Sequence, residues 1–258
     1  MERTALRRRL TWQLGEVVDT RTETSRAKSL TLAMPEWPGH RPGQHVDVRL
    51  TAEDGYRAER SYSIASPPEE APKVTITVER LEDGEVSPYL VDELKPGDHL
   101  ELRGPIGGYF VWEAQFGGPL LLVGGGSGIV PLMAMIRHRR AAQSTVPTRL
   151  LYSSRSQDEV IYRLELDDLA RSDALEVIFT LTRTQPSGWT GYHRRIDEAL
   201  LRDVAWPAAE RPLAYVCGPT ELVETAATHL VALGYDPAGV KTERFGPTGG
   251  DDGRPAGR

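Results

Sequence analysis

Cysteine is nearly absent from this 258-residue chain, and histidine is scarce and scattered. The one cysteine, Cys217, cannot form a disulfide within the chain. A chain-borne iron–sulfur cluster would need several grouped cysteine or histidine ligands. The six histidines have no metal-ligand spacing, so we expect neither a zinc site nor any other bound metal.

Long apolar runs and a strong charge of either sign are also missing. No stretch approaches the length of a membrane span, and residues 10–14, after a basic start, are too short and too polar for a signal peptide. The net charge of −6 argues against nucleic acid as a partner. We therefore expect a soluble, cytoplasmic protein without a membrane or nucleic-acid partner. Its oligomeric state is open, and residues 249–258 are expected to be a disordered tail.

Two patterns of hydrophobic residues divide the chain. In residues 10–116, runs with a period of two, as at 30–34, 46–50 and 74–78, are separated by Pro/Gly turns. This pattern predicts an antiparallel β-barrel or sandwich, and we expect the barrel. In residues 117–248, short apolar strands alternate with helical segments, which predicts an α/β Rossmann-like domain with a parallel sheet. Strands are expected at 120–123, 149–152, 175–181, 213–217 and 240–245. Helices are expected up to about 140 and at 159–170, 196–201 and 221–233.

A glycine-rich turn joins the first strand and the first helix of the second domain. Residues 124–128 read Gly-Gly-Gly-Ser-Gly, one residue away from the usual G-x-G-x-x-G spacing. Glycine lets the backbone approach phosphates, and the free N–H groups at a helix start attract an anion. The motif predicts a nucleotide pyrophosphate site, although glycines at this point could also simply form a tight turn.

Two motifs in the barrel could serve a second nucleotide. Residues 60–63, Arg-Ser-Tyr-Ser, combine a cation, an aromatic plane and hydroxyl groups. Residues 84–87, Gly-Glu-Val-Ser, place a glycine turn before a free helix N-terminus, with Pro88 at the first helical position and the helix ending before residue 95. Each motif also has a purely structural explanation. Residues 60–63 could be a strand with one surface arginine, and residues 84–87 could be an ordinary N-cap.

With these motifs in this order, the chain resembles the ferredoxin–NADP⁺ reductase superfamily of flavoproteins. The resemblance also rests on Gly-Pro-Ile-Gly at 104–107 with Phe110, on Pro131 after the glycine turn, and on Cys-Gly-Pro at 217–219. It covers residues 11–246. It implies FAD held by the barrel, a nicotinamide dinucleotide held by the second domain, and hydride transfer to flavin N5. The implied acceptor is a separate redox protein, such as a ferredoxin, a flavodoxin or an oxygenase-type partner.

The resemblance further implies roles for individual residues. Arg60 would pair with the FAD pyrophosphate, Tyr62 would pack on the flavin, and Ser63 would hydrogen-bond near flavin N5. Ser63, Cys217 and Glu243 make up the predicted catalytic set, with Cys217 as a small wall beside the nicotinamide and no nucleophile. The other implied cofactor contacts are Ser61, Val78, Arg80, Gly84, Glu85, Val86 and Ser87 for FAD, and Gly125, Gly126, Ser127, Gly128, Cys217, Gly218 and Pro219 for the nicotinamide nucleotide.

The C-terminal part departs from the family pattern. Glu243 and Phe245 have the spacing of the glutamate and the flavin-covering aromatic that end plant-type members. Here thirteen residues follow Phe245, so this aromatic is not expected to be the same kind of lid. A role for Phe245 in the core of the last strand is equally open.

The residues after the second and third strands bear on the choice of nucleotide. Ser154 and Arg155 follow the second strand, where an acid would select NADH and an arginine would accommodate the 2′-phosphate of NADPH, and no acid occurs before Asp158. Thr182 and Arg183, at the end of the third strand, resemble the Ser-Arg pair that binds this phosphate in the family. NADPH is therefore favoured, while NADH remains possible. The alternative is that both arginines are solvated surface residues.

Two other functions stay open at this point. A reductase that uses free flavin as a substrate would keep the fold, but it would not need the pyrophosphate grip of Arg60 and residues 84–87. A non-catalytic nucleotide-binding subunit would not need Ser63, Cys217 and Glu243.

Overall fold

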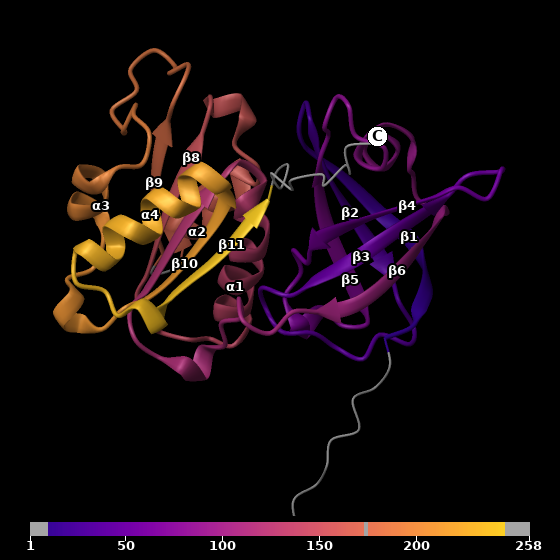
Figure 1. Cartoon of the computed structure of the whole chain (residues 1–258), viewed down its shortest axis with the longest axis horizontal. Helices are drawn as coiled ribbons and strands as arrows, with labels where there is room; N and C mark the ends of the chain where they lie inside the picture. The colour runs from indigo at the N-terminus through magenta and orange to yellow at the C-terminus, as the bar shows by residue number, and fades with distance from the viewer. Residues whose placement is uncertain (1–9, 173–174, 246–258) are drawn as a thin grey trace, which may run out of the picture.

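The computed structural model describes residues 10–172 and 175–245, which form two domains side by side (Figure 1). The predicted tail, 249–258, lies outside the described residues. Within the described ranges, no helix combines the length and the apolar character needed to cross a membrane.

The N-terminal domain is a six-stranded antiparallel barrel. The strand order is β4-β3-β6-β1-β2-β5, and a bridge between Ile64 and Ile76 joins the two edges. The predicted barrel is thereby confirmed. Its strands are β1 (Trp12–Thr24), β2 (Ala27–Ala33), β3 (His45–Thr51), β4 (Arg57–Ser63), β5 (Lys73–Glu79) and β6 (His99–Ile106).

The period-two runs explain the interior of the barrel. Leu30 and Leu32 of β2 and Ile76 of β5 are fully buried, while the alternate positions of these strands point to the other face. The short helix expected after Ser87 is present as one turn, η2 (Tyr89–Glu93), and it ends where Leu94 returns to an extended conformation. It packs its buried Leu90 into the same apolar cluster.

The C-terminal domain is a five-stranded parallel sheet in the order β11-β10-β7-β8-β9, which confirms the α/β prediction. The chain runs outward from β7 to β9 and then returns to β10 on the other side of β7. Its elements are β7 (Leu120–Gly125), α1 (Ile129–Ala141), β8 (Thr148–Ser154), α2 (Arg163–Ser172), β9 (Leu175–Leu181), α3 (Glu198–Val204), β10 (Leu213–Pro219), α4 (Thr220–Ala232) and β11 (Val240–Phe245).

Helices cover both faces of this sheet (Figure 1). On β7, Leu120 and Leu122 pack against the cluster that contains α1 and α2, whereas Leu121 and Val123 pack against the cluster of α3 and α4. A strand buried on both faces needs a continuous apolar run, which residues 120–123 supply.

The predicted start of the second helix is four residues too early. Residues Gln157–Glu159 form a 3₁₀ turn, and α2 begins only at Arg163. Between them Tyr162 has a φ of +62°, in the left-handed region, which interrupts a continuous helix.

The segment that joins the domains is packed against the sheet and its helices. Phe110 and Trp112 are buried, and both belong to the apolar cluster of α1 and α2. The Tyr215 hydroxyl on β10 donates a hydrogen bond of 2.7 Å to the carbonyl of Val111. This connection is therefore a fixed part of the α/β core.

Candidate functional site

The glycine turn after β7 meets the end of β10 at the point where the strand order reverses. Ligands of open parallel sheets bind in the crevice at such a point, outside the carboxyl ends of the strands. A Cβ atom added to Gly128 would lie 2.2 Å from the carbonyl oxygen of Cys217 and 2.8 Å from the nitrogen of Gly218. At Gly125 an added Cβ would lie 3.2 Å from Pro219. The two motifs that sequence analysis assigned to the nicotinamide nucleotide are therefore in direct contact.

The sheet register places two predicted catalytic residues beside this turn. Cys217 pairs with Gly124 of β7 on one side and with Glu243 of β11 on the other. Burial raises the pKa of the Cys217 thiol, and the neighbouring Glu243 adds to the shift. A protonated, buried thiol is a poor nucleophile. The role of Cys217 as a wall beside the nicotinamide stays a prediction.

Glu243 of β11 is half-buried beside Cys217. Burial raises its pKa to about 7. Its Oε2 atom is buried without a hydrogen-bond partner among the described residues. A buried carboxyl without a partner is costly unless it is protonated or meets a ligand. Phe245, two residues on, ends β11 opposite Pro219 and is exposed.

The two barrel motifs also converge. Arg60 Nη2 lies 2.7 Å from Glu85 Oε2, and the Tyr56 hydroxyl donates to the other carboxylate oxygen at 3.0 Å. The N–H groups of Glu85, Val86 and Ser87 donate to no acceptor among the described residues. An exposed guanidinium beside three free backbone N–H groups fits a diphosphate. The residues present therefore fit the FAD pyrophosphate.

The neighbouring residues of both motifs hold this geometry in place. The Ser87 hydroxyl accepts a hydrogen bond of 3.0 Å from the Leu81 N–H, and a Cβ on Gly84 would lie 2.7 Å from that same oxygen. Ser61 donates to Asp47 at 2.7 Å. Tyr62 packs against the barrel cluster, where burial raises its pKa to about 12. Ser63 pairs with His45 across β3 and β4.

Val78 and Arg80 lie differently from the rest of the predicted set. The Val78 side chain is fully buried in the barrel cluster, and Arg80 forms ion pairs with Glu82 and Asp92. The Val78 side chain is therefore closed to a cofactor, whereas the Arg80 side chain is 29% exposed. The alternate residues of β5, Thr77 and Glu79, face the α/β domain instead. Neither residue is in the predicted set, although the alternation of β5 is the signal that could have found them.

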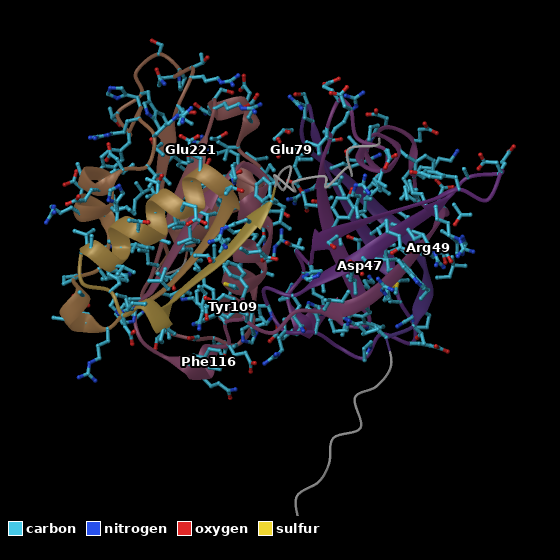
Figure 2. The ribbon with its side chains drawn as sticks, viewed as in Figure 1. Asp47, Arg49, Glu79, Tyr109, Phe116 and Glu221 are labelled. Atoms are coloured by element: carbon cyan, nitrogen blue, oxygen red, sulfur yellow. The ribbon has the colours of Figure 1, made fainter. Side chains whose placement is uncertain are left out.

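Glu79 lies at the junction between the domains, as Figure 2 shows. Its Oε2 atom is 3.7 Å from the position that a Cβ on Gly126 would occupy. Gly126 has a φ of +55° and lies within the glycine turn. The barrel therefore touches the nucleotide turn through β5.

The residues predicted to select the nucleotide form one cluster. The Thr182 N–H donates to the Ser154 carbonyl, and the Arg183 N–H donates to the Arg155 carbonyl, both at 2.9 Å. These bonds hold the ends of β8 and β9 together. Arg155 and Arg183 are exposed, and neither has an ion-pair partner within residues 10–172 and 175–245. Two unpaired guanidinium groups at this edge suit a phosphate.

Two family descriptions match the chain. The oxidoreductase FAD-binding domain matches residues 16–111, and the oxidoreductase NAD-binding domain matches residues 122–228. The fold and site thus define the class of protein, a two-domain oxidoreductase with an FAD-binding and an NAD-binding domain.

Similarity to individual proteins narrows that class. Ferredoxin–NADP reductase B of Sorangium cellulosum is 35% identical over 185 residues, which are 70% of this chain and 75% of that protein. The glycine betaine monooxygenase reductase subunit of Pseudomonas aeruginosa is 33% identical over 210 residues, 81% of this chain. The chain spans only 57% of that relative's length. On these similarities, the chain belongs to the ferredoxin–NADP⁺ reductase superfamily, and the resemblance seen in the sequence is confirmed.

A solved structure gives the same fold. The flavohem-like FAD/NAD-binding domain of nitric oxide dioxygenase from Vibrio cholerae superposes with a TM-score of 0.82 and 24% identity. The match covers 91% of this chain and 99% of that chain. At this identity the likeness concerns the fold alone.

Proposed function

We propose that this chain is an FAD-dependent reductase that takes hydride from NADPH and passes electrons to a separate redox protein. Membership of the superfamily supports the proposal, as do the FAD-binding and NAD-binding domains. Bound FAD and NADPH supply the hydride chemistry, which leaves binding and orientation to the protein.

One observation carries the proposal: the barrel and the nucleotide turn share a boundary. Hydride transfer requires the reacting atoms to lie about 3–3.5 Å apart. Two nucleotide sites at opposite ends of the molecule could not satisfy that requirement. Here Glu79 of the barrel approaches Gly126 of the turn, and Cys217 lies directly behind the turn.

The residues around this boundary have separable tasks. Arg60 and the backbone N–H groups of residues 85–87 bind the FAD pyrophosphate, and the glycine turn binds that of NADPH. Cys217, protonated and buried, limits the space beside the nicotinamide. Glu243, with a pKa of about 7, can hold or release a proton at neutral pH.

The acceptor we propose is a small redox protein, with ferredoxin as the first candidate and an oxygenase component as the second. The names of the two relatives support this choice, because one is a ferredoxin–NADP reductase and the other is the reductase subunit of a monooxygenase. Among the described residues no cluster of three or more side chains is arranged to hold a metal. A metal-containing acceptor would therefore be a partner of these domains.

The visible spectrum tests the proposal. The purified protein should be yellow with bound FAD, and anaerobic NADPH should bleach it. Added ferredoxin should then restore the colour. A colourless protein that oxidises NADPH only with added free flavin would support the flavin reductase instead. A protein that neither binds FAD nor oxidises NADPH would support a non-catalytic role and would refute the proposal.

A further inference from the structure

Two buried tyrosines link the glycine turn to the barrel. The Tyr152 hydroxyl on β8 donates to the carbonyl of Gly126 at 3.0 Å and accepts from the N–H of Ile161 at 3.3 Å. The next residue, Tyr162, donates through its hydroxyl to Thr77 Oγ1 of barrel strand β5. Tyr152 and Tyr162 are at most 1% exposed, and Thr77 is 4% exposed.

These contacts lead from the glycine turn to β5 and, along β5, back to the glycine turn. Thr77 lies two residues before Glu79 on β5, and Glu79 approaches Gly126, where the route began. We name these connected groups the tyrosine circuit: Gly126, Tyr152, Ile161, Tyr162, Thr77 and Glu79. The Tyr152–Ile161 and Tyr162–Thr77 hydrogen bonds are buried, and the Tyr152–Gly126 bond is partly buried. Leaving a buried hydrogen-bonding group without its partner destabilises the folded state.

The backbone of Tyr162 is strained in its place in the circuit. Its φ of +62° is rare for a bulky side chain, and such a backbone conformation is strained. A strained residue of this kind persists only where its surroundings fix it. The surroundings of Tyr162 belong to both domains, so the strain is held at the domain boundary.

Charged groups fix Tyr162 from the side of the α/β domain. The Arg137 guanidinium lies over the Tyr162 ring, 4.8 Å from its centroid, and donates to both carboxylate oxygens of Glu165 at 2.7 and 2.8 Å. Its third bond, 2.8 Å, goes to the Ala65 carbonyl in the barrel. Arg21 of β1 approaches the same carboxylate at 3.5 Å. Arg137 and Glu165 are both largely buried, so this pair is less screened than surface ion pairs.

A second set of bonds fixes the barrel end of the circuit. Thr77 Oγ1 is 2.8 Å from Ser29 Oγ, and Ser29 donates to Glu23 at 2.6 Å. Arg21 holds Glu23 through two bonds of 2.8 and 3.0 Å. The threonine that receives the Tyr162 hydroxyl is therefore immobilised by neighbouring strands.

We propose that Tyr152 and Tyr162 are positioning residues that set the distance between the nucleotide turn and the flavin barrel. Neither touches the reacting atoms. They act through Gly126, whose place relative to β5 decides where the nicotinamide meets the flavin. This inference rests on the proposed function for its kinetic consequence, whereas the physical link between the turn and the barrel does not depend on it.

Tyr162→Phe and Tyr152→Phe test the inference, because each removes one hydroxyl and keeps the ring. The matched control is Tyr235→Phe, since this buried hydroxyl donates to the Trp206 carbonyl at 2.9 Å within the α/β domain. A displacement of about 1 Å can cost about 100-fold in rate, so both circuit variants should lower the limiting rate of flavin reduction by about tenfold or more. FAD content and the dissociation constant for NADPH should change by less than about twofold, since less than about 0.4 kcal/mol of binding is lost.

Two substitutions of Thr77 test whether its hydroxyl group is the part that matters. Thr77→Val should lower the limiting rate as Tyr162→Phe does, whereas Thr77→Ser, which keeps the hydroxyl, should stay near the wild-type rate. Wild-type rates in Tyr162→Phe and Tyr152→Phe, or an equal loss in Tyr235→Phe, would overturn the inference.

Hydrogen exchange of residues 124–128, measured without nucleotide, separates this inference from the proposed function. Local opening is reported by such exchange, so Tyr162→Phe should speed exchange of the turn severalfold and Tyr235→Phe should not. If NADPH does not reduce the wild-type protein, the proposed function fails. Hydrogen exchange alone then decides whether the tyrosines link the turn to the barrel. Unchanged exchange in Tyr162→Phe would then refute the circuit.

Discussion

Gly128→Ala should separate nucleotide chemistry from FAD binding. The added Cβ would lie 2.2 Å from the Cys217 carbonyl oxygen and 2.5 Å from its carbon. Ordinary contacts begin near 3.4 Å, so the turn and the end of β10 would have to separate by about 1 Å. The obstructing atoms are backbone atoms in the middle of a sheet, which cannot rotate away.

The magnitude follows from that displacement. Overpacking of this kind costs about 1–3 kcal/mol of stability, and each kcal/mol lowers the melting temperature by about 2–4 °C in a protein of this size. A displacement of about 1 Å at the reacting atoms can cost about 100-fold in rate. We therefore expect flavin reduction by NADPH to slow by about that factor while FAD stays bound, because the Arg60 site lies in the other domain.

Stopped-flow reduction, FAD absorbance and thermal unfolding measure the three effects together. The control is Gly239→Ala, whose added Cβ would meet nothing closer than 3.6 Å. In this variant NADPH should reduce the flavin at the wild-type rate. A folded Gly128→Ala protein with an unchanged reduction rate would refute the role given to this turn.

Three further predictions follow from single side chains. Arg183→Ala should raise the Michaelis constant for NADPH by about tenfold or more, the value of one charge-assisted hydrogen bond, and should affect NADH much less; equal effects in steady-state assays would contradict NADPH selection. Arg60→Ala should weaken FAD binding by about 10- to 100-fold in fluorescence titrations, whereas Arg57→Ala on the same strand should not; equal losses would show a general effect of charge. Glu243, whose pKa rises from 4.5 to about 7 on folding, binds its proton more tightly in the native state, so stability should fall as pH rises from about 5 to 7 by on the order of 3 kcal/mol. Glu243→Gln should flatten that slope in thermal unfolding, and an unchanged slope would assign it to another group.

The sequence predicts most of the architecture because each signal is local. Residues 120–123 are apolar at every position and glycines follow them, so a buried strand that leads into a nucleotide turn is the simplest interpretation, and the structure has it. The alternation in β5 likewise places Val74 and Ile76 in the barrel.

Contacts between the domains could not be predicted in this way. Tyr162 carries no local signal for a left-handed conformation, and its apolar neighbours Val160 and Ile161 suggest a helix that in fact begins later. Arg137, read along its helix, is one of several basic residues, and only the assembled fold brings it over Tyr162. The assignment of Val78 to the cofactor came from the family resemblance, whereas its own place in the alternation indicates the barrel core.

The buried connection between the domains bears on how such proteins can be recombined. Phe110 and Trp112 precede residue 117, where the sequence pattern changes, yet both pack into the α/β half. A chimera joined at residue 117 would pack these two aromatics against the α/β domain of another protein, to which they are not fitted. A junction at Gly107, directly after β6, would keep both aromatics with the helices of their own α/β domain. Modular exchange in this architecture should therefore follow side-chain packing rather than the boundaries of hydrophobic patterns.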